Sequence, residues 1–129
     1  MILLDTHIWV RWLISEDIGS ELIELIENAE EACVSSISCW EVVLLANRGR
    51  IALSASAEQW INTALYEAQT TCLPIDRQTA VLAANLPDHH RDPADRIIIA
   101  TAIINGAQVI SFDKQFRKYD ELKGLLLPS

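Results

Sequence analysis

The sequence predicts an α/β fold with a central, mostly parallel sheet. Short apolar runs that suit buried strands alternate with longer segments whose apolar residues recur at helical spacing. Strands separated by helices are typical of βαβ units, which build parallel sheets. The chain has 129 residues, half of them hydrophobic, enough to bury one core. No repeat or linker divides it, so we expect a single domain over residues 1–129.

The first half of the chain is expected to contain two strands and three helices. The apolar run 2–4 predicts a buried strand, and 32–35 a second one. Helices are predicted at 6–14 and 19–30, because each has apolar residues three and four positions apart. A helix over 38–48 ends before Gly49, a residue that favours the position after a helix C-terminus.

The second half continues the alternation. A helix is predicted at 56–69 and another at 76–85, with a strand at 71–75 that Pro74 confines to a sheet edge. A polar loop precedes the helix at 93–105, which has Asp92 as its cap, Pro93 in its first turn and Gly106 past its end. A strand at 108–112 and a short one at 125–127 complete the chain.

Four acidic residues stand where one predicted element gives way to the next. Asp5 and Asp113 follow strands, whereas Glu41 and Asp95 fall in the first turns predicted for two helices. Parallel sheets place their sites beyond the carboxyl ends of the strands, so all four side chains can converge there. Carboxylates beside apolar segments need a partner, and a hard divalent cation is the simplest one.

Each acid also has a simpler explanation. Ser38-x-x-Glu41 matches a capping box, Asp95 suits the dipole of a helix N-terminus, and Asp113 suits a turn. Asp5 has no such role unless it caps the next helix. All four together favour a metal site, with the hydroxyls of Thr6 and Ser111 placed to orient the ligands.

Charge and cysteine content narrow the functional classes. A net charge of −8 and a pI near 4.7 argue against a broad non-specific nucleic-acid binder. Bound metal ions or a basic partner segment would remove that objection. Cys33, Cys39 and Cys72 lack zinc-site spacing and are interpreted as reduced packing residues. No apolar stretch is long enough for a membrane span and no signal peptide is apparent, so we expect a cytoplasmic protein.

The remaining histidines and tryptophans favour structural roles. We expect His89 and His90 to lie in a solvated loop, and His7 to be packed or hydrogen-bonded. The tryptophans are interpreted as core or interface residues: Trp9, Trp12, Trp40 and Trp60.

The chain resembles PIN-domain proteins, and among them the VapC-type toxins of bacterial toxin-antitoxin modules. The matching segments are 3–7, 36–42, 90–102 and 109–113, in family order. The block Asp92-Pro93-Ala94-Asp95-Arg96 before an Ile-rich helix is the most specific of them. Ser111 stands where many relatives have Thr.

This resemblance implies a three-layer α/β/α fold and a Mg²⁺- or Mn²⁺-dependent endoribonuclease held in check by a cognate antitoxin. It implies metal ligands at Asp5, Glu41 and Asp95, with Asp113 as a fourth, more variable acid. Asp92 would be a cap first and a ligand second. Arg48, Arg50, Arg96 and Lys114 are candidates to hold the RNA strand, although Arg96 could pair with a site carboxylate instead. A homodimer is expected as well.

Two other classes stay open on the residues alone. In the first, a non-catalytic interaction module, the acids are only helix caps. In the second, a phosphatase or phosphotransfer domain, a second Asp would be expected shortly after Asp5, and Asp5-Thr6-His7 lacks it.

Overall fold

The computed structural model describes residues 1–14, 16–89 and 92–128. In chain order, the elements are β1 (Ile2–Leu4), α1 (Thr6–Leu13), α2 (Ser20–Asn28), β2 (Ala32–Ser35), α3 (Ser36–Asn47), α4 (Ala57–Glu67), β3 (Thr71–Leu73), α5 (Arg77–Asn85), α6 (Pro93–Asn105), β4 (Gln108–Ile110), the 3₁₀ helices η1 (Lys114–Lys118) and η2 (Asp120–Leu122), and β5 (Leu126–Leu127).

The strands form one sheet in the order β3-β2-β1-β4-β5, and every neighbouring pair is parallel. The chain therefore builds outward from β1 to β3 and then returns to the other side of β1 with β4. Such a reversal opens a crevice beyond the carboxyl ends of the two strands that flank it. Here those strands are β1 and β4.

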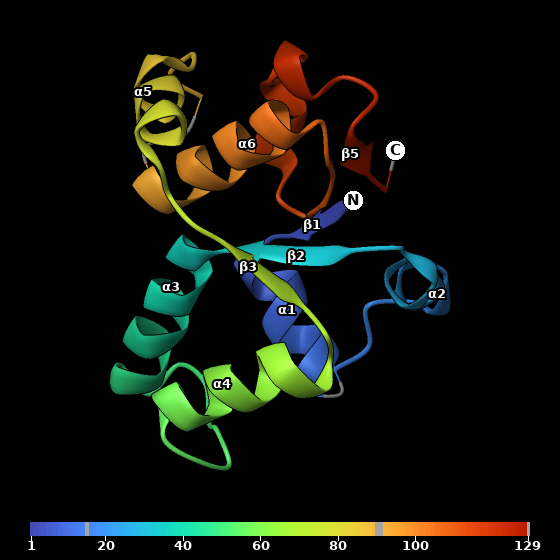
Figure 1. The fold of residues 1–129 in the computed structure, drawn as a ribbon, viewed down its shortest axis with the longest axis vertical. Helices are drawn as coiled ribbons and strands as arrows, with labels where there is room; N and C mark the ends of the chain where they lie inside the picture. Colours follow the sequence, from blue (N-terminus) through green and yellow to red (C-terminus); the bar gives the residue numbers. More distant parts are fainter. Residues whose placement is uncertain (15, 90–91, 129) are drawn as a thin grey trace.

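Helices cover both faces of the sheet, which confirms the predicted three-layer fold. Figure 1 shows α5 and α6 above the strands and α1, α3 and α4 below them. Side chains alternate along β1: Ile2 and Leu4 pack with α1, α2 and α4, whereas Leu3 packs with α6 and the 3₁₀ helices. Two cores, one on each face, thus fix the position of β1 and of the residues directly after it.

The boundaries of α6 match the prediction. The Asp92 side chain accepts a hydrogen bond from the Ala94 amide at 3.0 Å, Pro93 is the first helical residue, and Gly106 ends the helix with φ 59°. Pro93 has no amide hydrogen to satisfy and Gly106 tolerates positive φ, so both residues suit these positions.

The predicted start of α3 was wrong. The helix begins at Ser36, and its cap is Ser35, whose hydroxyl accepts from the Ile37 amide at 3.2 Å. Ser38 is therefore inside the helix, and Glu41 lies in the second turn rather than the first. The interpretation of Ser38 and Glu41 as a capping box was therefore wrong.

The strands are shorter than expected, because local chemistry ends them. β3 ends at Leu73, directly before Pro74, and occupies a sheet edge as predicted. β4 ends at Ile110 instead of 112, because the Ser111 hydroxyl accepts the Asp113 amide and Asp113 then caps η1. The two 3₁₀ helices had no counterpart in the prediction.

The tryptophans divide between core and surface. Trp9 is fully buried and packs edge-on against Trp60, with ring centroids 5.4 Å apart. Trp12 is partly buried against the same core. Trp40 is 55% exposed, so of its two predicted roles, core or interface, only the interface role stays open. Among the described residues, no helix has the length and apolarity that a membrane span requires.

Candidate functional site

A cavity of about 200 Å³ lies beyond the carboxyl ends of β1 and β4. It is formed by the first turns of α1, the start of α6 and the residues after β4. The lining residues are Asp5, His7, Ile8, Arg11, Asp92, Asp95, Phe112 and Asp113. Three of the four predicted acids therefore line one cavity, together with Asp92.

Asp5 is the most deeply buried of these acids. It directly follows β1, is 5% exposed, and caps α1 by accepting the Ile8 amide at 2.8 Å. Burial raises the pKa of its carboxyl, while hydrogen bonds from Ser111 and from the Ile8 amide act in the opposite direction. Ser111 thus contacts both Asp5 and the turn to Asp113.

Glu41 lies beside the cavity and is held by a buried relay of hydroxyl groups. The Thr6 hydroxyl donates to Glu41 Oε1, so the Ser38 hydroxyl, 2.7 Å from Thr6 Oγ1, must donate to Thr6. Burial raises the pKa of Glu41, the bond from Thr6 lowers it, and the charge of Asp92 raises it. Ser38, interpreted from the sequence as a cap, is part of this relay.

Asp95 has a strongly perturbed environment in the cavity. Burial raises the pKa of its carboxyl to about 8, and the negative charges of Asp92, Glu41, Asp113 and Asp5 all act in the same direction. Side chains from four separate segments thus repel one another at a single place. A cation bound here would relieve that repulsion.

Asp92 and Asp113 both act as helix caps. Asp92 caps α6, as predicted, and Asp113 accepts the Gln115 amide at 2.9 Å at the start of η1. A carboxylate offers about four acceptor sites on two oxygens. Capping therefore orients these groups without using up their capacity to bind a ligand.

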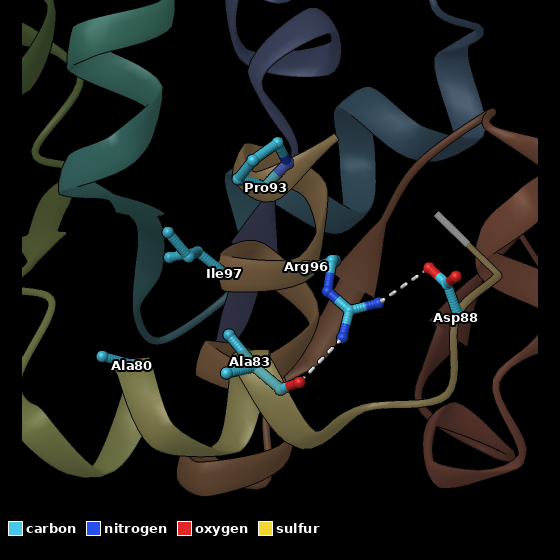
Figure 2. Close-up of a pocket in the computed structure, with 7 residues that line it drawn as sticks. Ala80, Ala83, Asp88, Pro93, Arg96 and Ile97 are labelled. Atoms are coloured by element: carbon cyan, nitrogen blue, oxygen red, sulfur yellow. Dashed lines mark hydrogen bonds and ion pairs between the residues drawn. The ribbon is translucent and has the colours of Figure 1, made fainter. Parts of the chain in front are cut away.

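Arg96 points away from the acidic cavity. Its guanidinium donates to the carbonyls of Ala84, Leu86 and Pro87 at 2.8–3.2 Å and lies 3.9 Å from Asp88. Figure 2 shows this side chain in a groove between α5 and α6, extended toward Asp88. The geometry favours a structural role, in which Arg96 ties the C-terminus of α5 to α6.

The other candidate cations are also outside the cavity wall. Arg48 and Arg50 are exposed beyond the C-terminus of α3, whereas Lys114 is exposed directly after Asp113. Of these, Lys114 is next in sequence to a residue that lines the cavity.

Three lining residues were missed or misread in the sequence. His7 is exposed in the cavity wall, so a packed position was wrong. Arg11 and Phe112 were not singled out at all. His7 and Arg11 lie four residues apart on one face of α1, a spacing that could have revealed both. His89 is exposed as expected, with its ring edge-on to Tyr119, and His90 lies outside the described residues.

The donor set favours a hard cation that keeps much of its water. Within the described ranges, no three or more His, Cys, Asp or Glu side chains form a group that could hold a metal ion, so a shell made of protein ligands is missing there. Zinc sites need such a shell. Mg²⁺ needs only one or two carboxylates and retains several waters, which the oxygen-rich cavity can provide.

Comparison with known proteins settles the family. The PIN domain matches residues 2–122. The chain belongs to the PIN-domain family. Ribonuclease VapC22 from Mycobacterium tuberculosis is 32% identical over 120 residues, which cover 92% of this chain and 91% of that protein. The resemblance found in the sequence is thus confirmed.

Solved structures share the PIN fold over almost the whole chain. VapBC2 from Rickettsia felis, bound to a promoter DNA fragment, matches with a TM-score of 0.71 at 16% identity, covering 98% of this chain and 97% of that one. A toxin-antitoxin complex from Klebsiella pneumoniae matches with a TM-score of 0.68 at 23% identity, covering 94% of each chain.

Proposed function

We propose that this PIN-domain protein is a Mg²⁺- or Mn²⁺-dependent endoribonuclease and the toxin of a toxin-antitoxin module. The observation that carries the proposal is the environment of Asp95, where burial and four neighbouring carboxylates raise the pKa to about 8. Strongly perturbed acids in a cavity are typical of functional sites. The similarity to a protein named as a ribonuclease supports the choice of reaction.

One or two of the carboxylates in the cavity wall, those of Asp5, Asp95 and Asp113, would contact the metal directly, and the others would bind its water ligands. Glu41 lies beside them and Asp92 at the rim. When bound, the ion supplies activation of water and neutralisation of charge on the phosphate. The chain itself keeps its carboxylates in place. Asp5 is fixed by the Ile8 amide and Ser111, and Glu41 by the relay from Ser38 through Thr6.

A non-catalytic interaction module is the second candidate. The observation in its favour is that Asp5, Asp92 and Asp113 all cap helices. Capping does not account for Glu41, which lies in the second turn of α3, or for the repulsion around Asp95. We therefore place the nuclease first.

The proposed partners follow from charge and from the neighbouring structures. An antitoxin with a basic tail would complement a chain of net charge −8 and an acidic cavity. Two similar structures are described as toxin-antitoxin or VapBC assemblies, which supports this partner. A cytoplasmic location and a homodimer are part of the same proposal.

The test is cleavage of a mixed cellular RNA pool by the purified chain with Mn²⁺ or Mg²⁺. We expect discrete fragments that disappear with EDTA and in Asp95→Asn. Glu24→Gln is the matched control, since it removes an exposed carboxylate from α2 and should cleave normally. Saturable Mn²⁺ binding that Asp5→Asn abolishes would support the metal site independently. Undiminished cleavage by Asp95→Asn or in EDTA would refute the proposal.

A further inference from the structure

Phe112 is a large apolar side chain exposed at a cavity that is lined mostly by charged and polar residues. It is 46% exposed and lines the same wall as Asp113 and Asp5. Its neighbours in sequence are anchored: the Ser111 amide donates to the Leu127 carbonyl at 3.1 Å, and the Ser111 hydroxyl accepts the Asp113 amide at 3.0 Å. The backbone thus holds this ring at the cavity, where it lies outside both cores.

A cation lines the same cavity on another element. Arg11 lies on the face of α1 that also carries His7, one turn further from the strand end. Its Nε is 3.7 Å from Glu16 Oε2, but the two side chains are 49% and 60% exposed. Exposed ion pairs contribute little free energy, so a phosphate group can replace Glu16 as the partner of Arg11.

An aromatic ring and an arginine at one cavity match the two parts of a nucleotide. Bases stack on aromatic side chains whatever their sequence, while cations contact the backbone. A base inside a duplex cannot reach such a ring without leaving its stack. A single strand presents its bases directly.

We propose that Phe112 stacks on an unpaired base next to the scissile phosphate and that Arg11 holds an adjacent phosphate. This inference rests on the proposed nuclease function, but its test is binding, which does not require cleavage.

The experiment measures fluorescence anisotropy of a labelled, short, random-sequence single-stranded oligoribonucleotide in Mn²⁺. A matched oligomer with the same backbone but abasic residues serves as the second probe. Phe112→Ala should weaken binding of the normal strand by about fivefold to 150-fold, the range expected for one lost stack. It should leave binding of the abasic strand unchanged.

Loss of the Arg11 side chain should affect binding differently from loss of the Phe112 ring. Arg11→Ala should weaken binding of both strands and reduce the slope of log affinity against log salt by about 1, as expected for one lost phosphate contact. Phe112→Tyr and Phe112→Trp should bind as the wild type does, whereas Phe112→Leu should resemble Phe112→Ala. Tyr66→Ala removes an aromatic ring that is 85% exposed on α4 and should change nothing.

The outcomes separate this inference from the nuclease itself. RNA binding that depends on Phe112, without any cleavage, would support the stacking role while the proposed function failed. Equal binding by wild type and Phe112→Ala would overturn the inference, even if RNA is cleaved. It would also be overturned if Phe112→Ala changed only the self-association of the chain, since the ring would then belong to a protein contact.

Discussion

At the scale of single residues, Asp95 links the site to stability. Its pKa is raised from 3.8 to about 8 in the folded chain, so the folded state binds a proton that the unfolded state releases between those values. Stability of the metal-free protein should therefore fall as pH rises through this window. The carboxylates are kept close at the expense of folding free energy, as at many functional sites.

Asp95→Asn should reduce this pH dependence, and the raised pKa values of Asp5 and Glu41 should preserve part of it. In EDTA at pH 8 we expect the variant to be more stable than the wild type by about 1–3 kcal/mol, less than the whole shift because coupled acids share it. Near pH 4 the two should be alike. Urea unfolding across this range measures the difference, with Glu24→Gln as the control. A wild-type pH slope in Asp95→Asn would show that another group is responsible.

Thr6 carries the second prediction at this scale. Thr6→Val keeps the shape but breaks the relay from Ser38 to Glu41. Loss of such a supporting group typically lowers metal affinity or activity about 10- to 100-fold, and the polar groups left unsatisfied cost about 1–3 kcal/mol of stability. Thr6→Ser restores the hydroxyl and should rescue both. Calorimetric Mn²⁺ titration measures the metal affinity, and urea unfolding measures the stability. If Thr6→Val bound Mn²⁺ with wild-type affinity, the relay would have no role in metal binding.

At the scale of elements, two serines near the start of α3 have different roles, one in helix capping and one at the proposed catalytic site. Ser35 caps the helix, and Ser38 belongs to the relay. Ser35→Ala should cost about 1 kcal/mol of unfolding free energy and leave RNA cleavage intact. Ser38→Ala should reduce cleavage as well. If only Ser35→Ala impaired cleavage, the roles assigned to the two serines would be reversed.

The link between α5 and α6 depends on Arg96. Arg96→Met keeps much of the side-chain volume but removes the bonds to three carbonyls at the end of α5. Bonds to a charged group are each worth about 1.5–3 kcal/mol, so we expect a loss of at least that order in thermal or urea unfolding. The salt dependence of RNA binding should not change. A reduced salt slope would instead place Arg96 on the substrate, as the sequence had suggested.

Sequence patterns located most elements because local signals agreed with tertiary structure. The boundaries of α6 were predictable since Asp92, Pro93 and Gly106 each fit one position of a helix. The start of α3 was not, because Ser35 and Ser38 are equally good caps, and only packing selects between them. The 3₁₀ helices after Asp113 are too short to produce a periodic pattern that can be recognised in the sequence.

At the scale of the whole molecule, strand order determines which acids meet. Asp5 and Asp113 were predictable as neighbours because β1 and β4 are parallel and adjacent. Arg11 and Phe112 could not be assigned in this way, since an exposed charge and an exposed ring have no distinctive pattern without the cavity. The relay to Glu41 required the contact between α1 and α3, which joins residues more than 30 positions apart in the sequence.

The acidic charge of the whole chain provides a competing explanation for any effect of metal. A net charge of −8 means that any salt stabilises the fold by screening. A specific site behaves differently: at about 100 times its dissociation constant, Mg²⁺ should add about 2.7 kcal/mol. Protons compete with metal for carboxylates, so this gain should be larger at pH 8 than at pH 6.

Thermal melts with MgCl₂, matched to NaCl at equal ionic strength, distinguish the two explanations. We expect Mg²⁺ to raise the melting temperature of the wild type and Glu24→Gln beyond the effect of NaCl, and more so at pH 8. Asp95→Asn should lose this excess, because the repulsion that the cation relieves centres on that carboxylate. If the two salts raised the melting temperature of the wild type equally, non-specific screening of the negative charge would explain the effect. The proposed metal site would then lack support.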